Sequence, residues 1–187
     1  MKKFLMFLVL GVFVVSLINC GGGQQGTTSN QDIPDWFLNP PKAEDAIYGV
    51  GSAKKASQSL AKSAADARAR EEIARAIEVK VQTMFKNFQQ ESGIGENAQA
   101  LEFVQNVSKQ IANATLTGTQ IEKRYAAKDG TIYTLMSYSM SEVKKQAKEK
   151  MKTNIHNEEA LYNEFKAKQA FDALDTEIDK MSGKEDY

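Results

Sequence analysis

The sequence predicts an α+β fold in which a small antiparallel sheet of about three strands packs on a long helix, with an additional long helix at the C-terminus. Apolar residues recur every three or four positions between residues 58 and 90, which indicates a long amphipathic helix. Two strand-like runs flank Asp129-Gly130, a dipeptide typical of hairpin turns. From Ser141 onward the helical period returns.

The chain begins with a short positive segment followed by an apolar one. Met1, Lys2 and Lys3 precede the run FLMFLVLGVFVVSLI. This run of about 15 residues has the length of a signal-peptide core and is shorter than the roughly 20 residues that span a bilayer as a helix. We therefore interpret residues 1–19 as a signal peptide, the alternative being an uncleaved membrane anchor with an incidental cysteine behind it.

Cys20 is the only cysteine of the chain, so it cannot form an intramolecular disulfide. Together with Leu17, Ile18 and Asn19 it resembles a bacterial lipobox, although Asn19 stands where Gly, Ala or Ser is usual. In a lipobox the cysteine receives a diacylglyceryl group and becomes the mature N-terminus. The resemblance therefore implies that Cys20 is lipidated, and several acyl chains hold a protein on a membrane more firmly than one. We expect no cofactor other than this covalent lipid.

Residues 20–31 are rich in small polar residues, which predicts a flexible tether after the lipidated Cys20. Gly21 stands in place of the Asp that retains enterobacterial lipoproteins in the inner membrane, so the resemblance favours the outer membrane. The chain has 24 basic and 24 acidic residues, and loss of Lys2 and Lys3 with the leader leaves the remainder weakly acidic. A nucleic acid is therefore not an expected partner, because binding it requires a concentrated basic surface.

The segment after the tether contains all three prolines, Pro34, Pro40 and Pro41, and the only tryptophan. The prolines favour an extended or turning path. Trp36, together with its neighbour Phe37, is predicted to anchor this path to the domain.

Residues 46–53 read as a short strand, in which Gly49 and Gly51 indicate a bulge or a close backbone approach. We therefore predict a set of structural anchors at the start of the domain, which comprises Trp36, Tyr48, Gly49 and Gly51.

The long helix, predicted over residues 58–90 with Ser57 or Ser59 as its cap, is alanine-rich in its first half. Its apolar stripe is either core or a surface for a partner. A helix of about 33 residues extends roughly 50 Å, whereas a domain of about 120 residues measures roughly 30 to 35 Å across. The second helix, the C-terminal helix or another copy of the chain must therefore cover the excess. The stripe consists of Ile73, Ile77, Val81, Met84 and Phe88.

Four elements are predicted after this helix. A second helix covers residues 96–114, and strands cover 117–127 and 131–140, of which the later is apolar on both faces. A long helical region follows from Ser141, with a break near residues 154–157, and residues 182–187 are expected to fray. A sheet of about three strands leaves edges exposed unless they are paired or covered.

Several of these segments together resemble the LPP-twenty lipoprotein family and related domains of flagellar accessory proteins. The likeness covers roughly residues 32–140. It implies a non-enzymatic outer-membrane lipoprotein with a compact α+β domain; some relatives assemble into discs or rings around the flagellar motor, so a protein partner or homo-oligomer is expected. The resemblance supplies no catalytic residues. Its motifs are Pro34-Asp35-Trp36, Asn39-Pro40-Pro41, Tyr48-Gly49-Val50-Gly51-Ser52-Ala53 and Ala64-Ala65-Asp66-Ala67-Arg68.

The predicted organisation is a signal peptide over residues 1–19, a tether over 20–31, an α+β domain over 32–153 and a helical extension over 154–187.

No catalytic or metal-binding constellation is evident in the sequence. The glycines around Val50 fit neither the dinucleotide fingerprint nor the P-loop. His156 is the only histidine, and we interpret it as a surface residue because one histidine cannot build a zinc site. We therefore expect neither an enzyme nor a metal protein. The alternative function is a membrane-tethered binding module for a small ligand or glycan, with a pocket near Trp36, Tyr48 and Tyr138.

Overall fold

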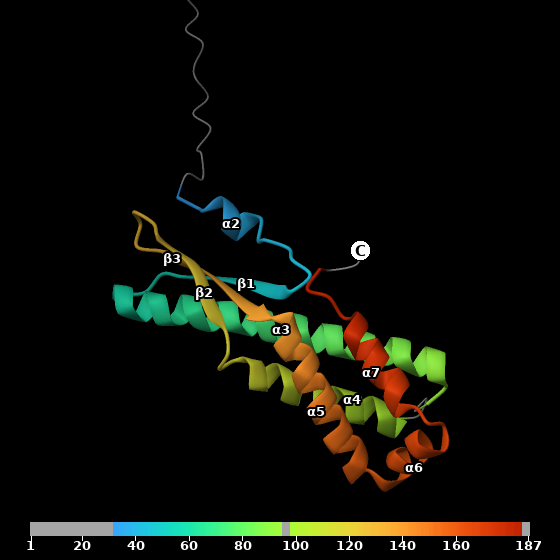
Figure 1. Ribbon diagram of the computed structural model, residues 1–187. Coiled ribbons are helices and arrows are strands. Elements are labelled where there is room, and N and C mark those ends of the chain that lie inside the picture. The colour runs from blue at the N-terminus through green and yellow to red at the C-terminus, as the bar shows by residue number, and fades with distance from the viewer. Residues whose placement is uncertain (1–31, 95–97, 185–187) are drawn as a thin grey trace, which may run out of the picture. The chain divides into compact units, whose positions relative to one another are not determined.

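The computed structural model describes residues 32–94 and 98–184. In this part of the chain, one end of a long helix underlies a three-stranded sheet and the other end packs among shorter helices (Figure 1). The α+β class and the antiparallel sheet predicted from the sequence are confirmed. The elements are α2 (Asp35–Leu38), β1 (Ala46–Ala53), α3 (Gln58–Ser92), α4 (Ala98–Thr115), β2 (Gln120–Ala126), β3 (Ile132–Ser139), α5 (Met140–Asn157), α6 (Glu159–Ala167) and α7 (Phe171–Lys180).

The sheet has the strand order β1-β3-β2, with both pairs antiparallel. β2 and β3 form the predicted hairpin, in which the Ala127 amide donates to the Thr131 carbonyl at 2.8 Å and Gly130 takes the positive φ of 85° that its turn requires. β3 is the central strand and is buried on both faces, as its two-sided apolar pattern predicts. The register between β2 and β3 shifts between Ile121 and Lys123, which marks a β-bulge.

The first half of α3 lies against the sheet, and it lies close because the facing residues are small. Ala61, Ala65 and Ala69 are fully buried on the helix. Alternate residues of β1, including Gly49 and Gly51, point toward them. Ser57 begins the helix, since its hydroxyl accepts a hydrogen bond from the Leu60 amide at 3.3 Å.

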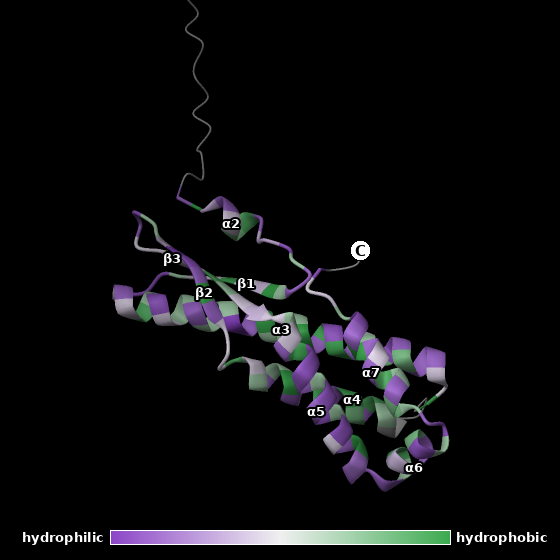
Figure 2. Ribbon diagram, in the orientation of Figure 1, coloured by the Kyte–Doolittle hydropathy of each residue, from purple (hydrophilic) through white to green (hydrophobic). Residues whose placement is uncertain are grey.

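The second half of α3 is covered by other helices of the same chain. Its apolar residues, all at most 3% exposed, join one core with α4, α5, α6 and α7: Ile77, Val81, Met84, Phe85 and Phe88. The ring of Phe88 stacks on Phe165 of α6 with centroids 5.4 Å apart. In Figure 2 green and purple bands alternate along α3, as expected for a helix with an apolar and a polar side. The stripe is therefore core, and α4 and α7 cover the excess length.

The C-terminal helical region is broken twice. α5 ends at Asn157, within the predicted break. A second break separates α6 from α7, where the sequence predicts one continuous helix. Here the Ala170 amide donates to the Phe165 carbonyl at 3.0 Å and the Gln169 amide donates to Lys166 at 3.3 Å, with Gln169 at a φ of 52°. This is the hydrogen-bond pattern of a Schellman motif, but with glutamine in the left-handed position that usually identifies the motif by a glycine.

Replacing Gln169 with glycine is expected to raise the free energy of unfolding by about 1 kcal/mol, because a side chain at positive φ carries a steric cost that glycine avoids. The matched control is Ala167→Gly, in the exposed last helical position of α6, which should instead lower it by about 1 kcal/mol. Urea unfolding curves measure both changes. Equal destabilisation by the two variants would contradict the assignment of a left-handed cap at Gln169.

α7 folds back onto α3 and α5. Lysines at successive turns of α5 reach it: Lys148 bonds Asp179 at 2.8 Å and Lys152 bonds Asp175 at 2.6 Å. The chain beyond α7 is held as well, since the Gly183 amide donates to the Glu44 carbonyl at 2.9 Å. The prediction that fraying begins at Ser182 is therefore wrong for residues 182–184, because this segment bonds to the residues that precede β1.

Candidate functional site

The residue with the most specific predicted role, Cys20, lies outside the described residues, as do the predicted signal peptide 1–19 and tether 20–31. The remaining predicted site residues, Trp36, Tyr48, Gly49 and Gly51, all lie in the described part of the chain, on α2 and β1.

The two glycines of β1 lie in direct contact with the backbone of α3. A Cβ atom at Gly51 would stand 2.1 Å from the Ala65 carbonyl oxygen, and one at Gly49 would stand 2.5 Å from that of Ala69. Neither position has room for a side chain, so these glycines set the distance between helix and sheet. Tyr48 lies on the opposite face of β1 and is half-buried.

Phe37, rather than Trp36, makes the ring contact that ties α2 to the sheet. Its ring meets Tyr133 of β3 edge to face, with centroids 4.8 Å apart. Trp36 is half-buried and packs on Phe37 at 6.5 Å. Tyr125 of β2 continues the row, at 6.4 Å from Tyr133. Phe37, Tyr133 and Tyr125 thus form an aromatic row on the face of the sheet away from α3, and the row ends at an exposed tyrosine.

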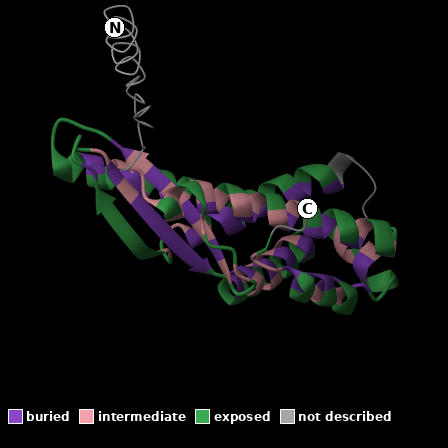
Figure 3. Cartoon of the chain, turned by 90° about the horizontal axis from the view of Figure 1, so that it is seen from above, coloured by how far each residue is buried: buried purple, intermediate pink, exposed green. Residues whose placement is uncertain are grey.

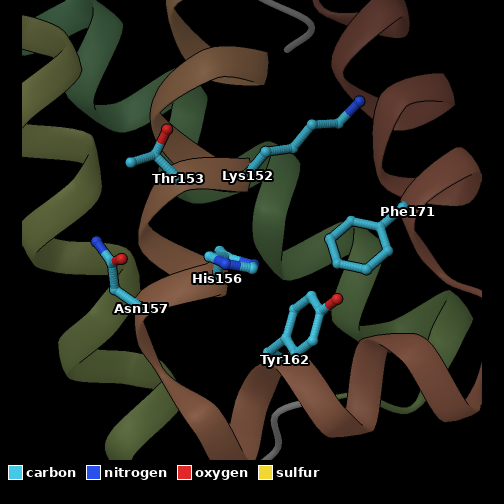
Figure 4. A pocket seen from close by; sticks show the side chains of 6 residues that line it. All are labelled: Lys152, Thr153, His156, Asn157, Tyr162 and Phe171. Carbon is cyan, nitrogen blue, oxygen red and sulfur yellow. The ribbon is translucent and has the colours of Figure 1, made fainter.

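The ligand pocket predicted near Trp36, Tyr48 and Tyr138 does not form. Tyr138 lies opposite Ile47 and joins the core beneath the sheet, whereas Tyr48 lies one residue further along β1 and points to the other face. A hollow of about 500 Å³ is found elsewhere, between α5, α6 and α7 (Figure 4). The rings of His156 and Tyr162 meet there edge to face at 4.9 Å. The hollow is lined by Lys152, Thr153, His156, Asn157, Tyr162 and Phe171.

Two of the polar side chains around this hollow form bonds within the chain. The Lys152 ammonium bonds Asp175, and the Thr153 hydroxyl donates to the Glu149 carbonyl at 2.8 Å. The hollow also presents the rings of His156, Tyr162 and Phe171 and the side-chain amide of Asn157 (Figure 4). No cluster of three potential metal ligands occurs within residues 32–94 and 98–184.

A partly buried ion pair joins α3 to the sheet. Asp66 is 9% exposed, and both of its carboxylate oxygens accept from one guanidinium nitrogen of Arg124, at 2.7 and 2.8 Å. The hydroxyl of Thr134, which is fully buried, donates to the same carboxylate at 2.9 Å. The group holds β2, β3 and α3 together and fixes the side chain of Arg124 on the α3 face of the sheet.

This cluster was not predicted, although the sequence contains a signal for it. Asp66 lies seven residues before Ile73, which places it on the buried face of the helix. A carboxylate on such a face requires a partner in the sheet.

The two edges of the sheet differ. On β1 the Val50 amide donates to the Glu72 carboxylate at 2.6 Å, and the Ser52 carbonyl accepts a hydrogen bond from the Arg68 guanidinium. Side chains of α3 thus occupy outward backbone groups of this edge. β2 forms the other edge, and all seven of its residues are exposed, so the strand is green along its length in Figure 3.

The turn that ends this open edge is fixed by its own residues. The Asp129 carboxylate accepts hydrogen bonds from the amide and the hydroxyl of Thr131, at 2.9 Å each, and from Lys54 at 3.2 Å. These bonds lower the pKa of Asp129 below its ordinary value. Burial and the nearby Asp129 carboxylate raise the pKa of Tyr133. Tyr133 therefore stays neutral across the physiological range.

Comparison with known proteins assigns this part of the chain to a family. A family model described as LPP20 lipoprotein matches residues 34–139, more than half of the sequence. The match begins at the proline before α2 and ends with β3, so it contains the whole sheet, α3 and α4. A comparison with curated proteins finds no match. Within residues 32–94 and 98–184, no helix combines the length and the apolar character that crossing a bilayer demands.

Proposed function

The chain belongs to the LPP20 lipoprotein family, and from this premise we propose that it is a non-enzymatic structural lipoprotein of the bacterial envelope, anchored through acylated Cys20. Membership of the family supports the general statement that the protein is a bacterial lipoprotein. The finer part is our proposal: the lipid is on Cys20, the membrane is the outer one, and the described domain serves assembly in the envelope. The association with the flagellar motor stays a prediction from the resemblance.

The observation that carries the proposal is the agreement between the family match and the packed unit of α3 and the sheet. The same chain has a lipobox-like cysteine twelve residues before the first described residue, Asp32. A segment of that length reaches at most about 40 Å, so a lipid on Cys20 keeps the domain near the membrane surface. Gly21 after the cysteine supports the outer membrane as the destination.

A structural role is also supported by how the described polar side chains are used. The carboxylate of Asp66 accepts hydrogen bonds from Arg124 and Thr134. Glu72 and Arg68 form hydrogen bonds with the backbone at the edge of β1. His156 packs against Tyr162. These groups stabilise contacts between elements, which is what a scaffold needs. The hollow beside His156 is where the alternative, a binding module for a small ligand or glycan, would place its ligand.

Replacing Cys20 with alanine is expected to abolish lipid attachment, because the thiol is the acceptor of the diacylglyceryl group. Cells labelled with radioactive palmitate should give a labelled wild-type band in the membrane fraction and an unlabelled Cys20→Ala band. Ser29→Ala, a change of similar size within the same segment, is the matched control and should label like wild type. A wild-type chain without label would contradict the proposal.

A further inference from the structure

We propose that β2 is an assembly surface on which a second copy of this chain adds its own β2, antiparallel, so that two three-stranded sheets become one six-stranded sheet. The inference deepens the proposed function and rests on it, because it names the surface through which the lipoprotein associates. A twofold axis would pass beside Tyr125.

The backbone of β2 has hydrogen-bonding groups that its own sheet does not use. The Ala127 amide bonds Thr131 across the hairpin, so the backbone groups of Ala127 point toward β3. Since direction alternates along an antiparallel strand, the amides and carbonyls of Ala126 and Arg124 point away from the sheet. No described strand pairs with that side. Such a row is a template for another strand.

The contrast with β1 indicates that this edge is left open selectively. On β1, Glu72 and Arg68 bond outward groups of Val50 and Ser52 and so obstruct a new strand. On β2, the middle residue Lys123 is exposed, whereas the neighbouring Arg124 is turned beneath the sheet to Asp66. The ion pair therefore draws one of the two adjacent positive charges away from the edge.

The sequence of β2 favours a second copy as the occupant, in one register. The bulge before Lys123 limits regular pairing to residues 123–127. An antiparallel pairing centred on Tyr125 sets Arg124 opposite Ala126 of the second copy, and Lys123 opposite Ala127. No like charges then lie opposite one another, whereas a register centred on Arg124 would place two arginines face to face.

The aromatic row provides the contact across the axis. Tyr125 is 38% exposed and ends the row that begins at Phe37 and Tyr133. In the register centred on Tyr125 the two Tyr125 residues form a non-hydrogen-bonded pair, in which side chains approach most closely. The two rows would then meet as one. The ladder shared by the two copies is short, so its affinity is expected to be low. The lipid anchor offsets this, because confinement to one membrane raises the effective concentration of the copies.

Cysteine cross-linking in membranes tests the pairing on the full chain. In a non-hydrogen-bonded antiparallel pair the Cα atoms lie about 4.5 Å apart, within the range of a disulfide. Tyr125→Cys should therefore give a covalent homodimer under mild oxidation, in about tenfold greater yield than the controls. The matched controls are Ile121→Cys, exposed beyond the bulge of the same strand, and Leu101→Cys on α4.

A second variant tests the backbone contribution. Ala126→Pro, added to Tyr125→Cys, removes an amide that points away from the sheet and should abolish the cross-link while leaving the circular dichroism spectrum unchanged. Tyr125→Cys yields equal to the controls, or an adduct with a different protein, would overturn the proposal. Equal yields in a chain that still incorporates palmitate reject the pairing alone, whereas a Tyr125 cross-link without palmitate label rejects the anchor alone.

Discussion

Gly51→Ala is expected to lower the free energy of unfolding by about 3 kcal/mol or more, a large fraction of the stability of a typical domain. The added methyl group would stand 2.1 Å from the Ala65 carbonyl oxygen and 2.6 Å from the Ala69 nitrogen. Both are backbone atoms of α3, so no side chain can rotate away to make room. Helix and sheet must separate, and the contacts between Ala53, Ala61 and Ile132 beside this position loosen with them.

Chemical denaturation followed by circular dichroism measures this change. Ser52→Ala is the matched control, because the adjacent side chain points to the other face of β1 and is half-buried there. Its effect should stay within about 0.5 kcal/mol. A Gly51→Ala protein as stable as the control would show that α3 does not lie against β1 as described.

Asp66→Ala is expected to destabilise the fold by about 2 to 3 kcal/mol, somewhat less than breaking a fully buried ion pair costs, because the Arg124 side chain is 26% exposed. The substitution leaves the guanidinium without its partner and the buried hydroxyl of Thr134 without its acceptor. The fully buried Thr134 hydroxyl is poorly placed to recover a hydrogen bond from water, whereas the partly exposed guanidinium recovers part of its hydration.

The reason for this loss is tested by a double substitution. Asp66→Leu combined with Arg124→Met removes both charges, and it should be considerably more stable than Asp66→Ala because no charge is left buried and unpaired. Arg124→Lys is a useful comparison, since it keeps the positive charge and a single donor nitrogen on a different side chain. If the double variant were less stable than Asp66→Ala, the pair would contribute net stability rather than compensate for its own burial.

The features predicted correctly are those whose cause is local in the sequence. Asp129-Gly130 determines a turn by backbone geometry alone, so the hairpin could be read directly. The apolar stripe of α3 follows from helical periodicity. The resemblance to the lipoprotein family rested on such local motifs, around Trp36 and Gly49, and the family match covers nearly the same residues.

The features that were missed depend on contacts between distant segments. Gln169 occupies a left-handed position that carries no sequence signal unless glycine is present. Asp66 and Arg124 are 58 residues apart, and only the packing of α3 on the sheet brings them together. The predicted pocket was wrong because Tyr48 and Tyr138 lie in paired strands at positions that differ by one residue, and a one-residue step reverses the face.

The central claim, a scaffold held on the envelope by lipid on Cys20, is tested most directly by the mass of the N-terminal peptide of the native protein. The account predicts a mature chain that begins at Cys20 and carries the mass of a diacylglyceryl group and its acyl chains on that residue. A chain that retains residues 1–19, or one that begins at Cys20 with an unmodified thiol, would contradict it.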